Sequence, residues 1–256
     1  MNSYSFFLNT TPIRFNESKC LEKAINSLLA QSLPPEKVYL CMPYRYKRFS
    51  DVPVNKPPDW LNTLTRQNKV KILYGNDYGG ATRYIYADQV KKEENLTNIC
   101  SADDDVIYKK DTLEKVWKFK EENGLDAACY WSYFWWYKDN DPDDIDHNIR
   151  YLQGVDMILT KVDILSGYFD FISRCYKEYE DSFLNDDLTF SYYLQLEGRK
   201  ISSIENDLIK PSKPSYEEQA TSKDDGRLTD TAVGKGEKYY KTFEIIDYLK
   251  SSHPIK

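Results

Sequence analysis

Short apolar runs alternate with segments of helical periodicity along the first 125 residues of the chain. The apolar runs span residues 4–9, 38–42, 70–74 and 98–102. Apolar side chains three or four residues apart, typical of helices, occur in residues 17–31, 81–91 and 111–122. Strands separated by helices of this length predict a parallel sheet with right-handed crossovers. Ligands of such sheets bind at the carboxyl ends of the strands.

Composition and charge narrow the class of protein further. The chain has 256 residues and a formal net charge of −6. A chain of this length buries roughly 70% of its unfolded surface, which is enough for a substantial core. The acidic balance argues against a nucleic-acid-binding protein, which would carry a basic face. No apolar run approaches the ~20 residues of a transmembrane helix.

The cysteines and the N-terminal segment predict the compartment. Five cysteines are spread along the chain without CxxC spacing. This pattern is typical of reduced, buried thiols. Residues 1–9 have neither the basic leader nor the cleavage site of a signal peptide. We therefore expect a cytoplasmic protein, and we expect residues 1–256 to form a single domain around one sheet.

An acidic cluster, Asp103 to Asp105, directly follows the fourth apolar run. Adjacent carboxylates repel one another unless a cation neutralises them. Their oxygens suit Mg²⁺ or Mn²⁺, which are often held by one or two carboxylates and substrate phosphates. If the strand continues, Asp103 and Asp105 point to the same side and Asp104 points elsewhere. The alternative is a solvated acidic turn that caps the next helix.

A second acidic segment, Asn185-Asp186-Asp187, opens a helix expected over residues 188–196. One reading is simple helix capping, because Asn and Asp are favoured at that position. Beside a metal and a diphosphate, one of the carboxylates could instead act as a general base.

A glycine-containing turn, residues 75–83, lies between the third apolar run and the next helix. Its glycines permit close approach of the backbone, and the start of the helix offers free N–H groups to an anion. Arg83, one turn into the helix, could contact a nucleotide base or phosphate. The alternative for Arg83 is a surface salt bridge.

The order of these segments resembles the GT-A-fold glycosyltransferases, and among them the family 2-like enzymes. The resemblance covers roughly residues 4–200 and rests on segments 9–14, 28–32, 77–83, 103–105 and 185–187. It implies an α/β, Rossmann-like fold with a mixed, mostly parallel central sheet flanked by helices. It also implies a metal-dependent, inverting transfer of a hexosyl or deoxyhexosyl group. The donor would be a nucleoside-diphosphate sugar of the UDP or GDP type, and the acceptor a hydroxyl of a glycan, a glycoprotein or another molecule.

The resemblance assigns the donor side of the reaction to residues of the first half, about 1–125. Asp103 and Asp105 would bind the Mn²⁺ or Mg²⁺ cofactor. Donor or nucleotide contacts would come from polar side chains near the strand ends: Thr10, Thr11, Arg14, Asp77, Arg83, Asp103 and Asp104. Asp77 and Arg83 would border the base and the ribose.

The resemblance places the acceptor side in residues 126–200, followed by a mobile loop and a C-terminal helix in 201–256. Asp187 would be the catalytic base, with Asp186 as its catalytic neighbour, although many members carry Glu-Asp at this point. Acceptor contacts would come from four residues: Trp135, Trp136, Gln153 and Gly154. His253 could complete the metal shell, as a histidine does in some members, but its context favours a disordered tail.

Two other functions remain open on the sequence. A nucleotidyltransferase also uses a parallel sheet, acidic residues and a metal, but it needs a glycine-rich loop after the first strand, where this chain has Thr-Thr-Pro-Ile-Arg. A catalytically inactive sugar- or nucleotide-binding protein could keep the same fold. The presence of both carboxylate motifs argues against such a loss.

Overall fold

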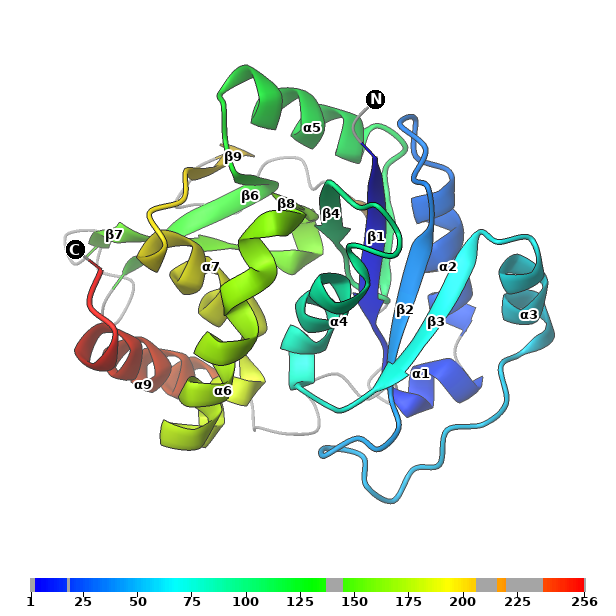
Figure 1. The fold of residues 1–256 in the computed structure, drawn as a ribbon, viewed down its shortest axis with the longest axis horizontal. Coiled ribbons are helices and arrows are strands. Elements are labelled where there is room, and N and C mark those ends of the chain that lie inside the picture. The colour runs from blue at the N-terminus through cyan, green and yellow to red at the C-terminus, as the bar shows by residue number, and fades with distance from the viewer. Residues whose placement is uncertain (1–2, 18, 137–144, 206–215, 220–236, 256) are drawn as a thin grey trace.

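The computed structural model describes residues 3–17, 19–136, 145–205, 216–219 and 237–255. An eight-stranded sheet runs through the molecule in the order β3-β2-β1-β4-β8-β6-β7, with β9 beside β6 (Figure 1). Among the described helices, none combines the length and apolar composition that crossing a membrane requires.

The first half forms the parallel part of this sheet. Its four strands are β1 (Tyr4–Asn9), β2 (Val38–Pro43), β3 (Val70–Gly75) and β4 (Asn98–Ser101). Each is parallel to its neighbours within this group. The helical segments between them are α1 (Pro12–Glu17), α2 (Lys19–Leu29), α3 (Asp59–Arg66), the 3₁₀ turn η1 (Gly79–Ala81) and α4 (Thr82–Val90). The parallel sheet predicted from the alternation is therefore confirmed.

The second half makes the sheet mixed. Its strands are β6 (Ala127–Trp136), β7 (Ile145–Leu152), β8 (Ile158–Lys161) and β9 (Ile201–Glu205). Strand β8 runs antiparallel to β4, whereas β9 is parallel to β6. A separate two-stranded sheet pairs β5 (Val106–Tyr108) with β10 (Tyr216–Gln219). The helical elements are α5 (Thr112–Glu122), η2 (Gly154–Asp156), η3 (Val162–Gly167), α6 (Tyr168–Glu178), η4 (Glu180–Leu184), α7 (Asp186–Leu196) and α9 (Glu237–Ser252).

Alternating side chains of the central strands build a core on each face of the sheet. Phe7 packs with the cluster formed by α4, α6, α7 and α9, whereas Phe6 and Leu8 pack with the cluster formed by α1, α2, α3 and α5. This is the period of two expected of a strand buried on both faces. Helices α4, α6 and α7 cover the near face in Figure 1.

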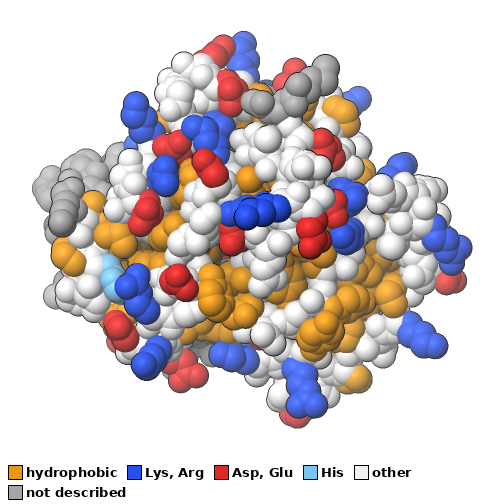
Figure 2. Space-filling model, in the orientation of Figure 1, with side chains coloured by type: hydrophobic (Ala, Val, Ile, Leu, Met, Phe, Trp, Pro, Cys, Tyr) orange, Lys and Arg blue, Asp and Glu red, His pale blue; other side chains and the backbone are white. Residues whose placement is uncertain are grey.

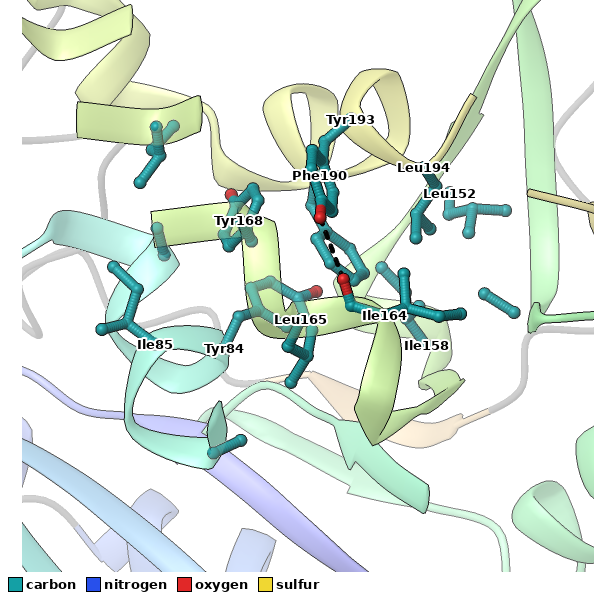
Figure 3. Packing of buried hydrophobic residues seen from close by; sticks show 14 of the residues in the cluster. Tyr84, Ile85, Leu152, Ile158, Ile164, Leu165, Tyr168, Phe190, Tyr193 and Leu194 are labelled. Carbon is teal, nitrogen blue, oxygen red and sulfur yellow. Dashed lines mark hydrogen bonds between the residues drawn. The ribbon is translucent and has the colours of Figure 1, made fainter. Parts of the chain in front are cut away.

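Aromatic rings dominate the core between α4, α6 and α7. The rings of Tyr84 and Phe190 stack with their centroids 3.8 Å apart, and Tyr168 meets Phe190 edge-on (Figure 3). The Tyr193 hydroxyl donates a hydrogen bond of 2.9 Å to the carbonyl of Ile164, drawn as a dashed line in Figure 3. This packing joins the parallel half to the helices of the second half, because Tyr84 belongs to α4 and Phe190 to α7.

Some element predictions were wrong in detail. The helix expected over residues 17–31 is α2 with shorter bounds, but the unpredicted helix α1 precedes it, and Asn16 lies inside α1 instead of capping α2. The Asn16 side chain instead donates to the carbonyl of Pro53. The strand expected over residues 151–160 is the end of β7, the turn η2 and β8, with Met157 at a φ of 59°. The apolar run conceals this turn because its residues stay buried on both sides of it.

The surface carries charges of both signs. Lys and Arg side chains are interspersed with Asp and Glu side chains over the face shown in Figure 2. This distribution agrees with the net charge of −6. Among the described residues, the exposed large hydrophobic side chains are Tyr44, Tyr74 and Phe169.

Candidate active site

The acidic cluster after β4 is a turn, not a continuation of the strand. Strand β4 ends at Ser101, and the Asp103 amide donates a 2.9 Å hydrogen bond to the hydroxyl of Tyr108 in β5. The expectation that Asp103 and Asp105 share one side of an extended strand is therefore wrong.

Two arginines divide the three carboxylates between them. Arg14 is ion-paired with Asp104, and its Nη2 lies 3.0 Å from Asp105 Oδ2. Asp103 is paired instead with Arg83, whose Nη1 lies 3.1 Å from Asp103 Oδ1. The Asp103 side chain is 34% exposed, against 6% for Asp104 and 8% for Asp105. Asp103 is thus the carboxylate of the cluster that a ligand from solvent can reach.

The turn before α4 places Arg83 at the carboxyl edge of the sheet. Asp77 accepts hydrogen bonds from the amides of Gly79 and Lys47, and Gly79 adopts a φ of +60°, which glycine tolerates. The Thr82 hydroxyl accepts from the Tyr78 amide. These bonds fix the start of α4, of which Arg83 is the second residue.

Arg83 joins the two acidic segments that the sequence singled out. Its Nη2 lies 2.6 Å from Asp186 Oδ2 and 2.9 Å from Asp187 Oδ1, while Nη1 contacts Asp103. The Arg83 side chain is only 6% exposed. The prediction of a surface salt bridge for this residue is therefore wrong. Arg83 instead forms buried ion pairs at the centre of the site.

The N-terminus of α7 holds the Asp186-Asp187 pair in place. Asn185 caps this helix, because its side-chain oxygen accepts from the Leu188 amide and from the Tyr151 hydroxyl, 3.0 Å away. Asp187 Oδ2 accepts a 2.8 Å hydrogen bond from the amide of Gly154. The capping reading is therefore confirmed for Asn185, whereas a general-base role for one of the aspartates stays a prediction.

Two glycines leave the space that these carboxylates occupy. A Cβ on Gly154 would lie 2.7 Å from Asp187 Oδ1 and 2.8 Å from Arg83 Nη2. A Cβ on Gly80 would overlap the carboxylate of Asp186. Sequence reasoning missed the role of Gly80, although its place between Asp77 and Arg83 was a signal. It also missed Asn9, whose side-chain amide donates a 2.5 Å hydrogen bond to the carbonyl of Gly80.

The clustering of like charges alters the acid–base properties of the site. Burial, and next the neighbouring Asp186, raise the pKa of Asp187 to about 7, although Arg83 opposes the shift. Burial also raises the pKa of Asp104, despite the Arg14 partner. Burial would lower the pKa of Arg83, but Asp186, Asp187 and Asp103 hold it well above its usual value. The arginine is therefore permanently charged, while Asp187 can exchange a proton near neutral pH.

Other predicted residues lie around this centre or outside it. Thr10 is buried at the end of β1, and the Thr11 hydroxyl accepts from the Arg14 amide. Gln153 precedes the η2 turn. Trp135 and Trp136 belong to β6, but their side chains lie outside the described part of the structure. His253 packs against Phe171 and Tyr248 beside α6 and α9, so this residue is ordered instead of belonging to a disordered tail.

Comparison with solved structures identifies the fold. A structure of S. aureus TarS 1-349 in complex with UDP-GlcNAc matches 97% of this chain and 66% of its own, with a TM-score of 0.54 at 14% identity. TarS is a GT-A-type glycosyltransferase. The chain has the GT-A fold. This confirms the fold class that the sequence resemblance predicted.

Two further structures match with lower TM-scores. Another S. aureus TarS 1-349 structure matches 80% of this chain with a TM-score of 0.48 at 13% identity, and the chain covers 59% of it. The mannosyltransferase PcManGT from Pyrobaculum calidifontis, in complex with GDP-Man and Mn²⁺, gives 0.49 at 12% identity over 78% of this chain and 54% of its own. The chain thus spans less than two thirds of these proteins. No protein-family model and no curated protein sequence matches the chain.

The carboxylates of this site could bind a hard divalent cation only if a substrate supplied further oxygen ligands. Among the described residues, no three His, Cys, Asp or Glu side chains converge as a metal site. Asp103 offers carboxylate oxygens at the exposed edge, whereas the Asp105 side chain is buried against Arg14. Mg²⁺ and similar ions are commonly bound by one or two carboxylates with substrate phosphates. The residues present fit that mode of binding, in which Asp103 would be the protein ligand.

Proposed function

We propose that this chain is a metal-dependent, inverting glycosyltransferase. It would move a hexosyl or deoxyhexosyl group from a UDP- or GDP-type sugar to an acceptor hydroxyl. The observation that carries the proposal is the joining of Asp103 to Asp186 and Asp187 through one buried arginine at the carboxyl edge of a GT-A sheet. A donor-side carboxylate and a candidate base thus share one site.

Asp187 is suited to accept the proton of the acceptor hydroxyl. Its carboxylate is partly exposed, with side-chain exposure of 21%, and its pKa is raised toward neutrality. As the new bond forms between the acceptor oxygen and the anomeric carbon, the bond to the diphosphate oxygen breaks. The hydroxyl proton passes to Asp187, and the nucleoside diphosphate leaves with the bonding electrons. A base on the face opposite the leaving group inverts the configuration.

The donor would lie along the carboxyl edge of the parallel strands. Asp103 is the residue that would hold Mn²⁺ or Mg²⁺ together with the donor diphosphate. A bound metal of this kind supplies Lewis-acid stabilisation of the leaving group. Thr10, Thr11 and Asp77 would contribute nucleotide contacts from the ends of β1 and β3. A role for Asp105 at the metal would require its side chain to leave Arg14.

Donor class is supported by the fold comparison. The TarS structure that shares the fold contains UDP-GlcNAc. In this chain, residues 1–125 would bind the nucleotide sugar, and residues 126–200 would contact the acceptor through Gln153, Gly154, Trp135 and Trp136. A single domain over residues 1–256 and a cytoplasmic location complete the proposal.

A thermal-shift screen tests donor binding. The protein is melted with UDP, GDP, dTDP or CMP, each with Mn²⁺, with Mg²⁺ and with EDTA. A ligand at 100 times its dissociation constant adds about 2.7 kcal/mol to stability, so binding raises the melting temperature. We expect a rise with UDP or GDP that requires the metal, and a smaller rise in the Asp103→Asn variant. No shift with any nucleotide would favour an inactive protein that has kept the fold.

A further inference from the structure

We propose that Arg83 is a positioning residue that holds the general base Asp187 and the donor-side carboxylate Asp103 in a fixed relation. The inference rests on the proposed glycosyl transfer. It replaces the nucleotide contact that the sequence resemblance assigns to Arg83, because the guanidinium is already engaged by protein groups on both of its ends.

The two ends of the guanidinium serve different sides of the reaction. Nη1 donates to Asp103 at 3.1 Å and to the carbonyl of Ala102 at 3.3 Å, both at the end of β4. Nη2 donates to Asp186 at 2.6 Å and to Asp187 at 2.9 Å, both at the start of α7. A planar, rigid fork therefore sets the spacing between the two acidic segments.

Packing next to Arg83 keeps this fork in place. The Tyr84 hydroxyl lies 3.0 Å from Ser101 Oγ, which ties α4 to the last residue of β4. The Tyr84 ring stacks on Phe190 of α7 (Figure 3). The backbone that carries Arg83 is thus attached to the same two elements that its side chain bridges, so the arginine has little freedom to release either side.

Gly154 completes the arrangement with a backbone donor. Its amide donates to Asp187 Oδ2, while Arg83 donates to Oδ1, so each oxygen of the base has its own donor. The missing side chain leaves room for both groups, because a Cβ there would lie 2.8 Å from Arg83 Nη2. A base held by two donors has its remaining lone pairs directed to one region, as proton transfer requires.

The positive charge of Arg83 also affects the protonation of Asp187. The charged groups that face Asp187 are Arg83, Asp186 and Asp103, so one guanidinium offsets the repulsion of three carboxylates. A neutral residue at position 83 leaves that repulsion uncompensated. Protonation of Asp187 then extends to higher pH, because the ionised base loses its nearest cation.

The experiment measures release of UDP from UDP-GlcNAc and of GDP from GDP-mannose, with Mn²⁺ and with water as acceptor. The variants are Arg83→Lys, which keeps the charge without the fork, Arg83→Gln, and Gly154→Ala, which crowds the contact without removing charge. Lys161→Gln is the matched control. Lys161 forms an ion pair with Asp126 and lies opposite Asn98, at the other end of β4 from Asp103.

We expect kcat to fall about tenfold in Arg83→Lys and Gly154→Ala and about 100-fold in Arg83→Gln, the range of a misplaced proton-transfer group. The KM for the donor should stay within about threefold. The acidic limb of the pH profile should move to higher pH in Arg83→Gln. A kcat within threefold of wild type in Arg83→Lys and Gly154→Ala would overturn the proposal. A loss confined to KM would also overturn it and return Arg83 to the nucleotide.

A second readout separates this inference from the proposed function. Carboxyl ¹³C NMR follows the titration of Asp187 in the protein without donor or metal. The Asp187 resonance is assigned by its absence in Asp187→Asn. We expect this resonance to titrate at higher pH in Arg83→Gln than in wild type, and an unchanged titration overturns the coupling. A wild-type protein that releases no UDP or GDP refutes the proposed function. Should Arg83→Gln not fold, Arg83→Lys and Gly154→Ala decide the kinetic question.

Discussion

Three properties of Asp187 determine its acid–base behaviour. It lies in the first turn of a helix, it accepts hydrogen bonds from both Arg83 and the Gly154 amide, and it is crowded by Asp186. The donors stabilise the charged form, whereas burial and Asp186 oppose it. Burial and Asp186 prevail, and the pKa of Asp187 rises to about 7. A general base is most effective when its pKa lies near the working pH.

Replacing Asp187 by Asn tests the base at the scale of one residue. We expect the transfer rate to fall about 10²- to 10⁴-fold, the contribution of a positioned general base. Donor affinity, measured by isothermal titration calorimetry with UDP and Mn²⁺, should change by less than about twofold, because the donor diphosphate is assigned to Asp103. Asp170→Asn, an exposed aspartate of α6, is the control and should match wild type. Wild-type turnover in Asp187→Asn would contradict the assignment.

The raised pKa of Asp187 also predicts how stability changes with pH. Folding raises this pKa above its value in the unfolded chain, so the stabilising effect is complete at low pH and is lost as the pH rises through about 7. Asp187→Asn removes the ionisable group. We therefore expect it to melt above wild type at pH 8, and the difference to shrink toward pH 5. Melting curves recorded without nucleotide or metal check this, and a difference that grows toward low pH would contradict it.

At the scale of elements, the start of α7 determines whether the two aspartates face the site. Asn185 bonds the Leu188 amide and the Tyr151 hydroxyl, which ties the helix to β7. The start of α5 offers a contrast. Asp111 occupies its N-cap position without a side-chain capping bond and pairs with Lys115 instead. Of these two N-cap residues, only Asn185 caps its helix and also bonds a residue of another element.

This contrast gives a prediction for helix capping. Asn185→Ala should lower the free energy of unfolding by about 1–2 kcal/mol, because it removes the cap and leaves the Tyr151 hydroxyl without that acceptor. Asp111→Ala is the matched control and should cost under about 0.5 kcal/mol, since its ion pair is exposed. Urea unfolding measures both. Equal losses in the two variants would show that the Asn185 contacts contribute no more than an ordinary exposed residue.

Sequence patterns located some elements well and others poorly, for identifiable reasons. Strand β1 has the predicted bounds because its apolar run ends sharply at Asn9 and Thr10. The break between β7 and β8 was not predicted. Leu152 and Ile158 are both buried on either side of η2, so the apolar pattern continues through a turn that depends on Met157 adopting a positive φ. Helix α3 was missed because it follows a proline-containing loop and buries only Leu61.

At the scale of the whole molecule, the order of the strands brings the site together. Strand β4 lies at the centre of the sheet, between β1 and β8, where the parallel half meets the mixed half. Both acidic segments were singled out from the sequence, and for residues 103–105 so was the position at the carboxyl edge of the sheet. Their link through Arg83 could not be predicted, because it joins residues 20 and 104 positions apart that only the packing of α4 and α7 brings into contact.

The proposed metal dependence involves the whole site and gives a further prediction. Asp103→Asn should weaken the metal-dependent part of UDP or GDP binding by about tenfold, since it removes one charge–charge contact. Binding in EDTA should be weak in both proteins. Asp163→Asn, at an exposed position of η3, is the control. Manganese titrations at fixed nucleotide measure the effect, and an unchanged manganese requirement in Asp103→Asn would contradict the metal role.

The most direct test of the account is the stereochemistry of the transferred sugar. ¹H NMR can follow the first turnovers of UDP-GlcNAc or GDP-mannose, both α-linked, with diamagnetic Mg²⁺ and with water as acceptor. An inverting reaction with Asp187 as base predicts that the β-anomer of the released sugar forms first and that Asp187→Asn forms neither anomer at a measurable rate. Release of the α-anomer first, or equal rates in the two proteins, would contradict the central claim.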